Sequence, residues 1–148
     1  MPLNTRSKKR EPIESIVEFS VHNLADQTVG LNLPKAAITL EPNKVVKSTL
    51  FDISASGCAI SSSYVIPPGV ILDIKIDSTP FNIQGALERK EPFLFSGKVK
   101  SCIMKAAGQY RLGIKFQNPE KADSDFISSF ISIRERRRDP RWDMTKKE

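Results

Sequence analysis

Asp52, Ser54 and Gly57 are the residues of this chain whose types and spacing best suit a ligand, and they lie in the stretch FDISASGCAI at residues 51–60. Apolar residues precede and follow them, so the stretch predicts a strand, a tight turn and a second strand. Asp and Ser side chains bond nearby backbone N–H groups, and a glycine can adopt φ > 0 or let a ligand approach the backbone. The pattern therefore predicts either a plain hairpin turn or a polar binding loop between two strands.

A second candidate is the basic run RSKKR, in which Arg6 and Arg10 are four residues apart. Guanidinium groups bind phosphate oxygens bidentately and also match the O6/N7 edge of guanine, at about 1–3 kcal/mol of discrimination for each good pair. A solvated, solubilising tail is the alternative, because the same spacing recurs at Arg134/Arg138 and Arg137/Arg141. A disordered arm loses about 1–2 kcal/mol of backbone entropy for each residue fixed, so closing it over a ligand needs several such contacts.

Taken together, the two motifs resemble those of the PilZ family of cyclic di-GMP receptors. The shared pattern is arginine at four-residue spacing, followed later by aspartate, one residue, serine, two residues and glycine. The stretches SGKVKSCIM, at residues 96–104, and YRLGIKF, at residues 110–116, are similar to the late strand pair of that family. The resemblance covers residues 6–133, and the combination of motifs is more specific than either motif alone.

The resemblance implies a mainly β fold, namely a six-stranded antiparallel β-barrel with a C-terminal α-helix. It also implies a role for each motif residue in binding cyclic di-GMP. Arg6 and Arg10 would contact phosphate and guanine, while Asp52 would accept hydrogen bonds from guanine N1–H and N2–H. Ser54 would bond a phosphate or ribose, and Gly57 would leave room for the ring.

Three further residues are auxiliary candidates for the same ligand: Lys9, Arg141 and Trp142. Trp142 is the single tryptophan and stands beside Arg141 in a polar tail. Its two interpretations are local packing on the preceding helix, and stacking on a purine or docking to a partner.

The function that the resemblance implies is that of a receptor or adaptor. Cyclic di-GMP would order the arginine arm and create a surface for an unidentified effector protein, in bacterial motility, biofilm or polysaccharide control. The alternatives are a PilZ-like interaction protein that binds no nucleotide and, with less support, a small β-barrel that binds nucleic acid. We expect no enzyme, because the single histidine has no recognisable nucleophile or base partner and no glycine-rich phosphate loop is present.

Composition and charge are compatible with this interpretation. The net charge of +6 divides into +4 on residues 1–10, +3 on residues 134–148 and −1 on the rest, so the basic charge lies on two arms. Nucleic-acid binding is therefore disfavoured, as is membrane insertion, since no apolar run approaches the ~20 residues that cross a bilayer. We expect a cytoplasmic protein with two buried free thiols, Cys58 and Cys102, no metal site and no cofactor besides its ligand.

Apolar periodicity predicts the elements that position these residues. Short strands are expected over residues 13–21, 44–51, 59–65, 70–76, 93–104 and 109–116, the last two as a hairpin, with weaker strands within residues 24–44 and 81–87. A helix is expected after Pro119, capped by Asp123 or Ser124 and presenting one apolar face to the barrel. We divide the chain into a flexible basic arm at 1–12, a barrel with its helix at 13–134, and a basic mobile tail at 135–148.

Overall fold

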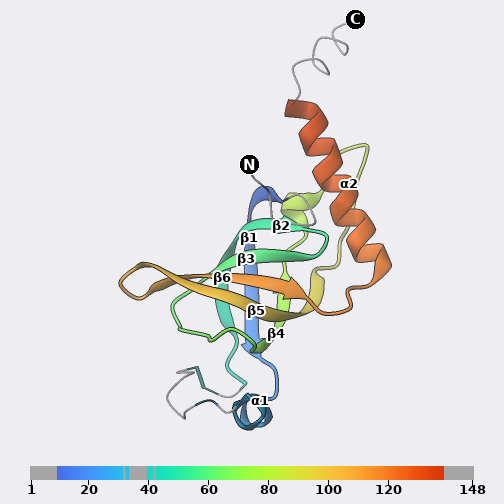
Figure 1. Ribbon diagram of the computed structural model, residues 1–148. Coiled ribbons are helices and arrows are strands. Elements are labelled where there is room, and N and C mark those ends of the chain that lie inside the picture. Colours follow the sequence, from blue (N-terminus) through green and yellow to red (C-terminus); the bar gives the residue numbers. More distant parts are fainter. Residues whose placement is uncertain (1–9, 32, 34–39, 42, 139–148) are drawn as a thin grey trace, which may run out of the picture.

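Six antiparallel strands close into a barrel in the order β1-β2-β3-β6-β5-β4, with a helix at each end (Figure 1). The computed structural model describes residues 10–31, 33, 40, 41 and 43–138. The strands are β1 Glu11–Val21, β2 Val46–Ser54, β3 Gly57–Ser62, β4 Ile71–Ile76, β5 Phe93–Ala106 and β6 Gln109–Phe116. The helices are α1 Leu24–Gly30 and α2 Lys121–Arg138, with one 3-10 turn at Thr79–Phe81. The predicted fold class is confirmed.

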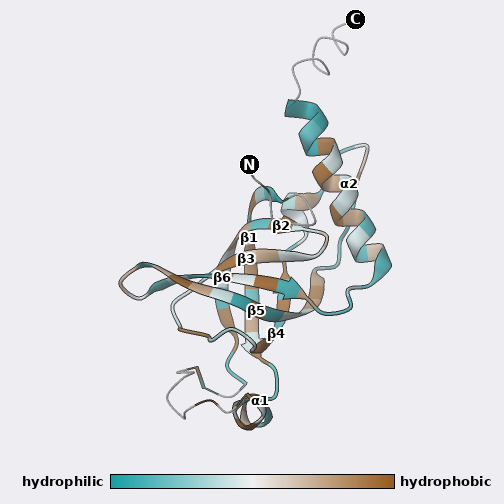
Figure 2. Cartoon of the chain, viewed as in Figure 1, coloured by the Kyte–Doolittle hydropathy of each residue, from teal (hydrophilic) through white to brown (hydrophobic). Residues whose placement is uncertain are grey.

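Alternation along the strands builds the core. Every second residue of β1 is buried, and Val17 and Phe19 lie inside the barrel. In Figure 2 the strands carry bands of both hydrophobic and hydrophilic residues. Because successive side chains of a strand point to opposite faces, closing the sheet places one face of all six strands in a common interior.

The β5–β6 hairpin reaches beyond the barrel, as Figure 1 shows at the left. β4 pairs with β5 only from Phe93 to Lys98, whereas β6 pairs with β5 as far as Ala106. The turn between the two strands has Gly108 at φ 72°, in the left-handed region that glycine tolerates. The predicted hairpin is confirmed.

Helix α2 packs on the barrel through Ile127, Phe130 and Ile131, which are all buried. The ring of Phe130 lies 5.0 Å from that of Phe81 in the 3-10 turn. The predicted helix is confirmed, but its predicted cap is wrong, since α2 begins at Lys121 and Asp123 lies inside its first turn. There Asp123 accepts a 2.8 Å hydrogen bond from Arg89, which fixes the start of the helix to the loop before β5.

Two weaker strand predictions are wrong. Residues 24–30 form α1, whose Gln27 side chain bonds the backbone N–H and C=O of Ile71 at 2.6 and 2.8 Å. Part of the predicted strand pair, residues 32, 34–39 and 42, lies outside the described residues. Residues 81–87 hold the end of the 3-10 turn and a single bridge between Ile83 and Leu87, not a strand.

Two element boundaries differ from the predicted division of the chain. β1 begins at Glu11, inside the predicted arm, and α2 ends at Arg138, inside the predicted tail. Both of these residues belong to the folded body because they bind each other.

Candidate functional site

Asp52 is the centre of a cluster of charges on the barrel surface. Arg10 Nη1 donates to one of its carboxylate oxygens at 2.8 Å, and Arg111 Nη2 donates to the other at 2.7 Å. The Asp52 side chain is only 14% exposed, and those of Arg10 and Arg111 are 21% and 29% exposed. Two half-buried guanidinium groups therefore share one carboxylate, which leaves the cluster with one net positive charge.

Strand register brings these three residues together. Arg10 immediately precedes β1, and Pro12 is paired with Asp52 of β2. β2 pairs with β3 and β3 with β6, so Asp52 lies opposite Ala59, and Ala59 lies opposite Gly113. Arg111 stands two residues before Gly113 on the same strand face and reaches back to Asp52. Arg111 was not predicted, because nothing near it in the chain shows that β6 lies two strands away from Asp52.

An aromatic ring lies beside the charges. Phe51 is 40% exposed, and the Cζ atom of Arg111 lies 5.4 Å from the centre of its ring. Phe51 also borders a groove of about 440 Å³ on β2, β3 and the hairpin, where serine hydroxyls and the side chains of Tyr110, Lys47 and Lys105 gather. Among the described residues, none of those that line this groove is acidic. The surface can thus accept a ring face, hydroxyl groups and negative charge.

The turn that follows Asp52 is held by its own side chains. Ser54 is buried, and its Oγ accepts a 3.2 Å hydrogen bond from the backbone N–H of Ser56. Gly57 does not have a positive φ, which was one of the two roles expected of it. A Cβ atom there would overlap the carbonyl oxygen of Ile114, so the closeness of β3 to β6 is what requires glycine. The ligand contacts expected of Ser54 and Gly57 remain predictions.

Glu11, next to Arg10, ties the same region to α2. Its carboxylate is 1% exposed and receives hydrogen bonds of 2.5 and 2.9 Å from Arg138. Arg134 lies 3.4 Å from it, one helical turn earlier. Arg134 and Arg138, which have the same four-residue spacing as Arg6 and Arg10, thus both bind the Glu11 carboxylate. They can do so because residues at i and i+4 lie on one helix face. Hydrogen bonding to Glu11 raises the pKa of Arg138.

Cys58 lies beneath the cluster and is fully buried. Burial raises the pKa of its thiol to about 12, while the nearby Arg10 charge lowers it and the Asp52 charge raises it by smaller amounts. Cys58 and Cys102 are both free, as predicted, although Cys102 is only half-buried. A thiol with such a raised pKa stays protonated and unreactive at neutral pH.

Four predicted residues, Arg6, Lys9, Arg141 and Trp142, lie outside the described residues. Of the predicted site, the structure therefore brings together Arg10 and Asp52, with Ser54 at the end of β2 and Gly57 at the start of β3. In the part of the chain that is described, no group of acidic, histidine or cysteine side chains could hold a metal ion. None of the described helices is long and apolar enough to cross a membrane.

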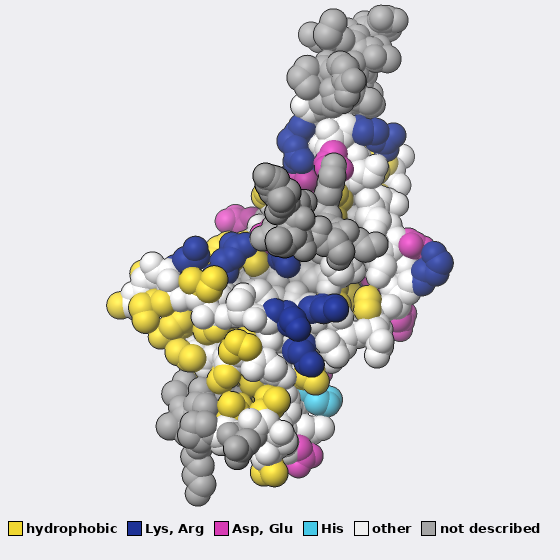
Figure 3. Space-filling model, viewed as in Figure 1, with side chains coloured by type: hydrophobic (Ala, Val, Ile, Leu, Met, Phe, Trp, Pro, Cys, Tyr) yellow, Lys and Arg dark blue, Asp and Glu magenta, His cyan; other side chains and the backbone are white. Residues whose placement is uncertain are grey.

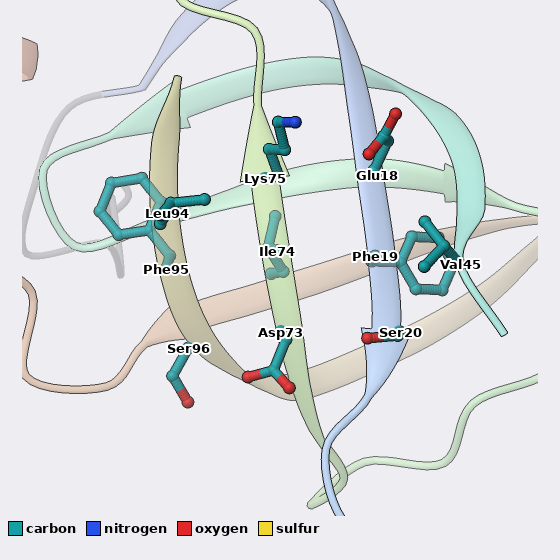
Figure 4. A pocket seen from close by; sticks show the side chains of 10 residues that line it. All are labelled: Glu18, Phe19, Ser20, Val45, Asp73, Ile74, Lys75, Leu94, Phe95 and Ser96. Carbon is teal, nitrogen blue, oxygen red and sulfur yellow. The ribbon is translucent and has the colours of Figure 1, made fainter. Parts of the chain in front are cut away.

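A separate pocket of about 480 Å³ lies across β1, β4 and β5 (Figure 4). It is lined by both acidic and basic side chains, including Glu18, Asp73 and Lys75, beside apolar ones such as Leu94. His22, whose Nδ1 is 3.2 Å from the Asp73 carboxylate, stands near its edge. The pocket and the Asp52 cluster share no described residue, so they are separate regions of the barrel surface.

Known proteins resemble this chain in sequence pattern and in fold. A family model described as the PilZ domain matches residues 6–132. No curated protein sequence gave a significant match. Among solved structures, the chain is similar to the inhibitor of motility MotI/DgrA of Bacillus subtilis, with a TM-score of 0.64 and 11% identity, over 93% of this chain and 54% of that one.

Two structures of YcgR from Escherichia coli are also similar. The PilZ domain of YcgR with c-di-GMP gives a TM-score of 0.56 at 12% identity, over 90% of this chain and 94% of that one. YcgR in complex with c-di-GMP gives 0.60 at 15% identity, over 99% and 52%. The chain thus spans about half the length of MotI/DgrA and of the longer YcgR chain. At these identities the likeness concerns the fold.

Proposed function

Because the chain belongs to the PilZ domain family, we propose that it is a cyclic di-GMP receptor whose ligand binds at the Asp52 cluster. The single observation that carries the proposal is the pairing of Asp52 with Arg10 and Arg111, at 2.8 and 2.7 Å. Both similar structures of YcgR are complexes with c-di-GMP, which supports this choice of ligand.

The mechanism that we propose is an exchange of partners. Without ligand, each guanidinium group is bound to an Asp52 oxygen. A guanine brings N–H donors for Asp52, and the same nucleotide brings phosphate oxygens and a base edge for the arginines. Every charged group would then lose one partner and gain another, so binding does not leave a half-buried charge unpaired.

Arg111 and Phe51 complete the proposed site on the barrel side. Arg111 is held by a strand, so it loses little freedom on binding, whereas Arg10 lies where the chain enters β1. A purine could stack on the exposed ring of Phe51, since base–aromatic stacking contributes about 1–3 kcal/mol for each base. The expected arm contacts of Arg6, with Lys9, Arg141 and Trp142 as auxiliaries, remain part of this proposal.

The output of the receptor is proposed to be a protein contact. Closure of the arm over the ligand would create a new surface for an effector in motility, biofilm or polysaccharide control. The similarity to the Bacillus subtilis protein, an inhibitor of motility, supports the first of these. We propose no catalytic role for the chain.

Calorimetric titration of cyclic di-GMP tests the receptor proposal directly. We expect saturable binding by the wild type and a loss of at least about tenfold in affinity for Arg10→Ala and for Asp52→Ala. Lys90→Ala, in an exposed loop, is the matched control and should bind like the wild type. No binding by a folded wild type would refute the receptor function and favour a PilZ-like interaction protein that binds no nucleotide.

A further inference from the structure

The β5–β6 hairpin differs in charge from the rest of the barrel. Residues 93–116 carry five basic side chains and no acidic one, although residues 11–133 together have a net charge of −1. The five are Lys98, Lys100, Lys105, Arg111 and Lys115. The nearly neutral body is therefore divided into a basic hairpin and an acidic remainder, a division that net charge alone conceals.

Register places much of this charge on one outer face. Lys98 lies directly opposite Lys115, and Ile103 lies opposite Arg111. The alternate residues of β6, Leu112 and Ile114, are buried, so Arg111 and Lys115 point away from the core.

The pair Lys98 and Lys115 has an energetic cost, because like charges directly opposite each other in a sheet are destabilising. Among the described residues, neither lysine has an acidic side chain within ion-pair distance. Lys115 is exposed and Lys98 is half-buried, so both remain accessible from solvent. An anionic partner on this face would remove the repulsion.

The end of the hairpin adds apolar surface. Ile103 is 52% exposed and Met104 is 63% exposed. Beyond Val99, β5 has β6 as its only strand neighbour within the described residues. In Figure 3, Lys and Arg side chains gather at the centre of the face, and hydrophobic ones gather toward the left, where the hairpin projects.

We infer that this hairpin is a docking surface for an acidic, amphipathic protein segment. The hairpin surface consists of Lys98, Lys115 and Ile103 on the outer face, Met104 on the opposite face of the exposed hairpin end, and Lys100 and Lys105 beside them. Its positive charge is complementary to Asp and Glu side chains, and Met and aliphatic side chains suit contact with a protein. This surface adjoins the proposed nucleotide site, since Lys105 lines the groove beside Phe51 and Lys115 lies opposite Gly57, but none of these six residues binds Asp52.

Nucleic acid fits this surface less well. Proteins that bind single strands combine basic charge with exposed aromatic rings on which bases stack. Within the hairpin, Phe93, Phe95 and Phe116 are buried and Tyr110 is half-buried. The side chains that the hairpin does expose at its end, Ile103 and Met104, provide no such ring.

Selection from a random peptide library against the whole protein tests the inference. The selected peptides should be enriched in Asp and Glu interleaved with aliphatic residues. One labelled consensus peptide is then titrated by fluorescence anisotropy into the wild type, into Lys98→Glu/Lys115→Glu, and into Ile103→Ser/Met104→Ser. The control is Lys90→Glu/Lys121→Glu, which makes the same change in charge at exposed positions outside the hairpin.

We expect at least about a tenfold loss of affinity in the charge-reversed hairpin variant and a smaller loss in the serine variant. The control should bind the peptide like the wild type, and circular dichroism should show all variants folded. Peptides without acidic enrichment, or equal binding by the hairpin and control variants, would overturn the inference. The inference would also be overturned if a labelled oligothymidylate bound through the same lysines more tightly than the peptide, because the partner would then be nucleic acid. Cyclic di-GMP titration of the same variants separates this result from the receptor proposal.

Discussion

Arg138 donates two hydrogen bonds, of 2.5 and 2.9 Å, to the carboxylate of Glu11, which is 1% exposed. The last turn of α2 is thereby fixed to the first residue of β1, one residue from Arg10 and the Asp52 cluster. Two neighbouring residues therefore hold the candidate site and the C-terminal helix in place. Arg10 binds Asp52 of β2, and Glu11 binds Arg138 of α2.

Replacing Glu11 should destabilise the fold. Glu11→Ala removes both hydrogen bonds to Arg138 and leaves its guanidinium without this partner, so we expect the free energy of unfolding to fall by about 1–3 kcal/mol. Urea denaturation measures the change. Glu14→Ala, three residues further along the same strand and exposed, is the control. Equal stability of the two variants would show that the contact contributes nothing.

Arg111 should contribute to cyclic di-GMP affinity as much as Arg10 does. Arg111→Ala removes one of the two guanidinium groups on Asp52, and we expect cyclic di-GMP affinity to fall about tenfold. Arg111→Lys should recover only part of the loss, because an ammonium group lacks the bidentate geometry of guanidinium. Calorimetry gives both values, and a wild-type affinity in Arg111→Ala would remove this residue from the site.

Gly57→Ala separates a structural role from a ligand role. The new methyl group would meet the carbonyl oxygen of Ile114, so we expect a loss of about 1–3 kcal/mol in the free energy of unfolding even without ligand. Gly30→Ala is the control, since nothing lies within 4 Å of a Cβ at that position. If Gly57→Ala keeps wild-type stability but loses nucleotide binding, the glycine serves the ligand instead.

The Cys58 thiol should make stability depend on pH in the alkaline range. Its pKa is raised by burial from an ordinary value of 9.0 to about 12, so the unfolded chain loses this proton first. The stabilising effect is complete below pH 9 and is lost as pH rises toward 12, with a slope of at most about 1.4 kcal/mol per pH unit. Cys58→Ala lacks the effect, so the stability difference between wild type and variant should narrow over this interval in urea denaturation. A constant difference would contradict the buried, protonated thiol.

Local sequence pattern was sufficient for most of the secondary structure. Alternation predicted β1 and β4, the residues around Gly108 predicted the hairpin, and the change of period after Pro119 predicted α2. These signals come from neighbours in the chain, because burial of one strand or helix face imposes its own period. Short patterns were less informative. The alternation of Val29, Leu31 and Leu33 suggested a strand, but helix α1 forms there, and its Gln27 side chain binds the backbone of Ile71.

The sequence by itself, through its resemblance to the PilZ family, determined the barrel class and predicted that Arg10 and Asp52 lie in one site. Only the tertiary structure decided that Arg111 forms a second ion pair with Asp52 and that Arg138 forms an ion pair with Glu11. It also decided that the carbonyl group of Ile114 leaves no room for a Cβ atom at residue 57. The physical reason is the same in each case. Closure of the barrel and packing of α2 set the register between strands and helices far apart in the chain, and no local pattern encodes which side chains then meet.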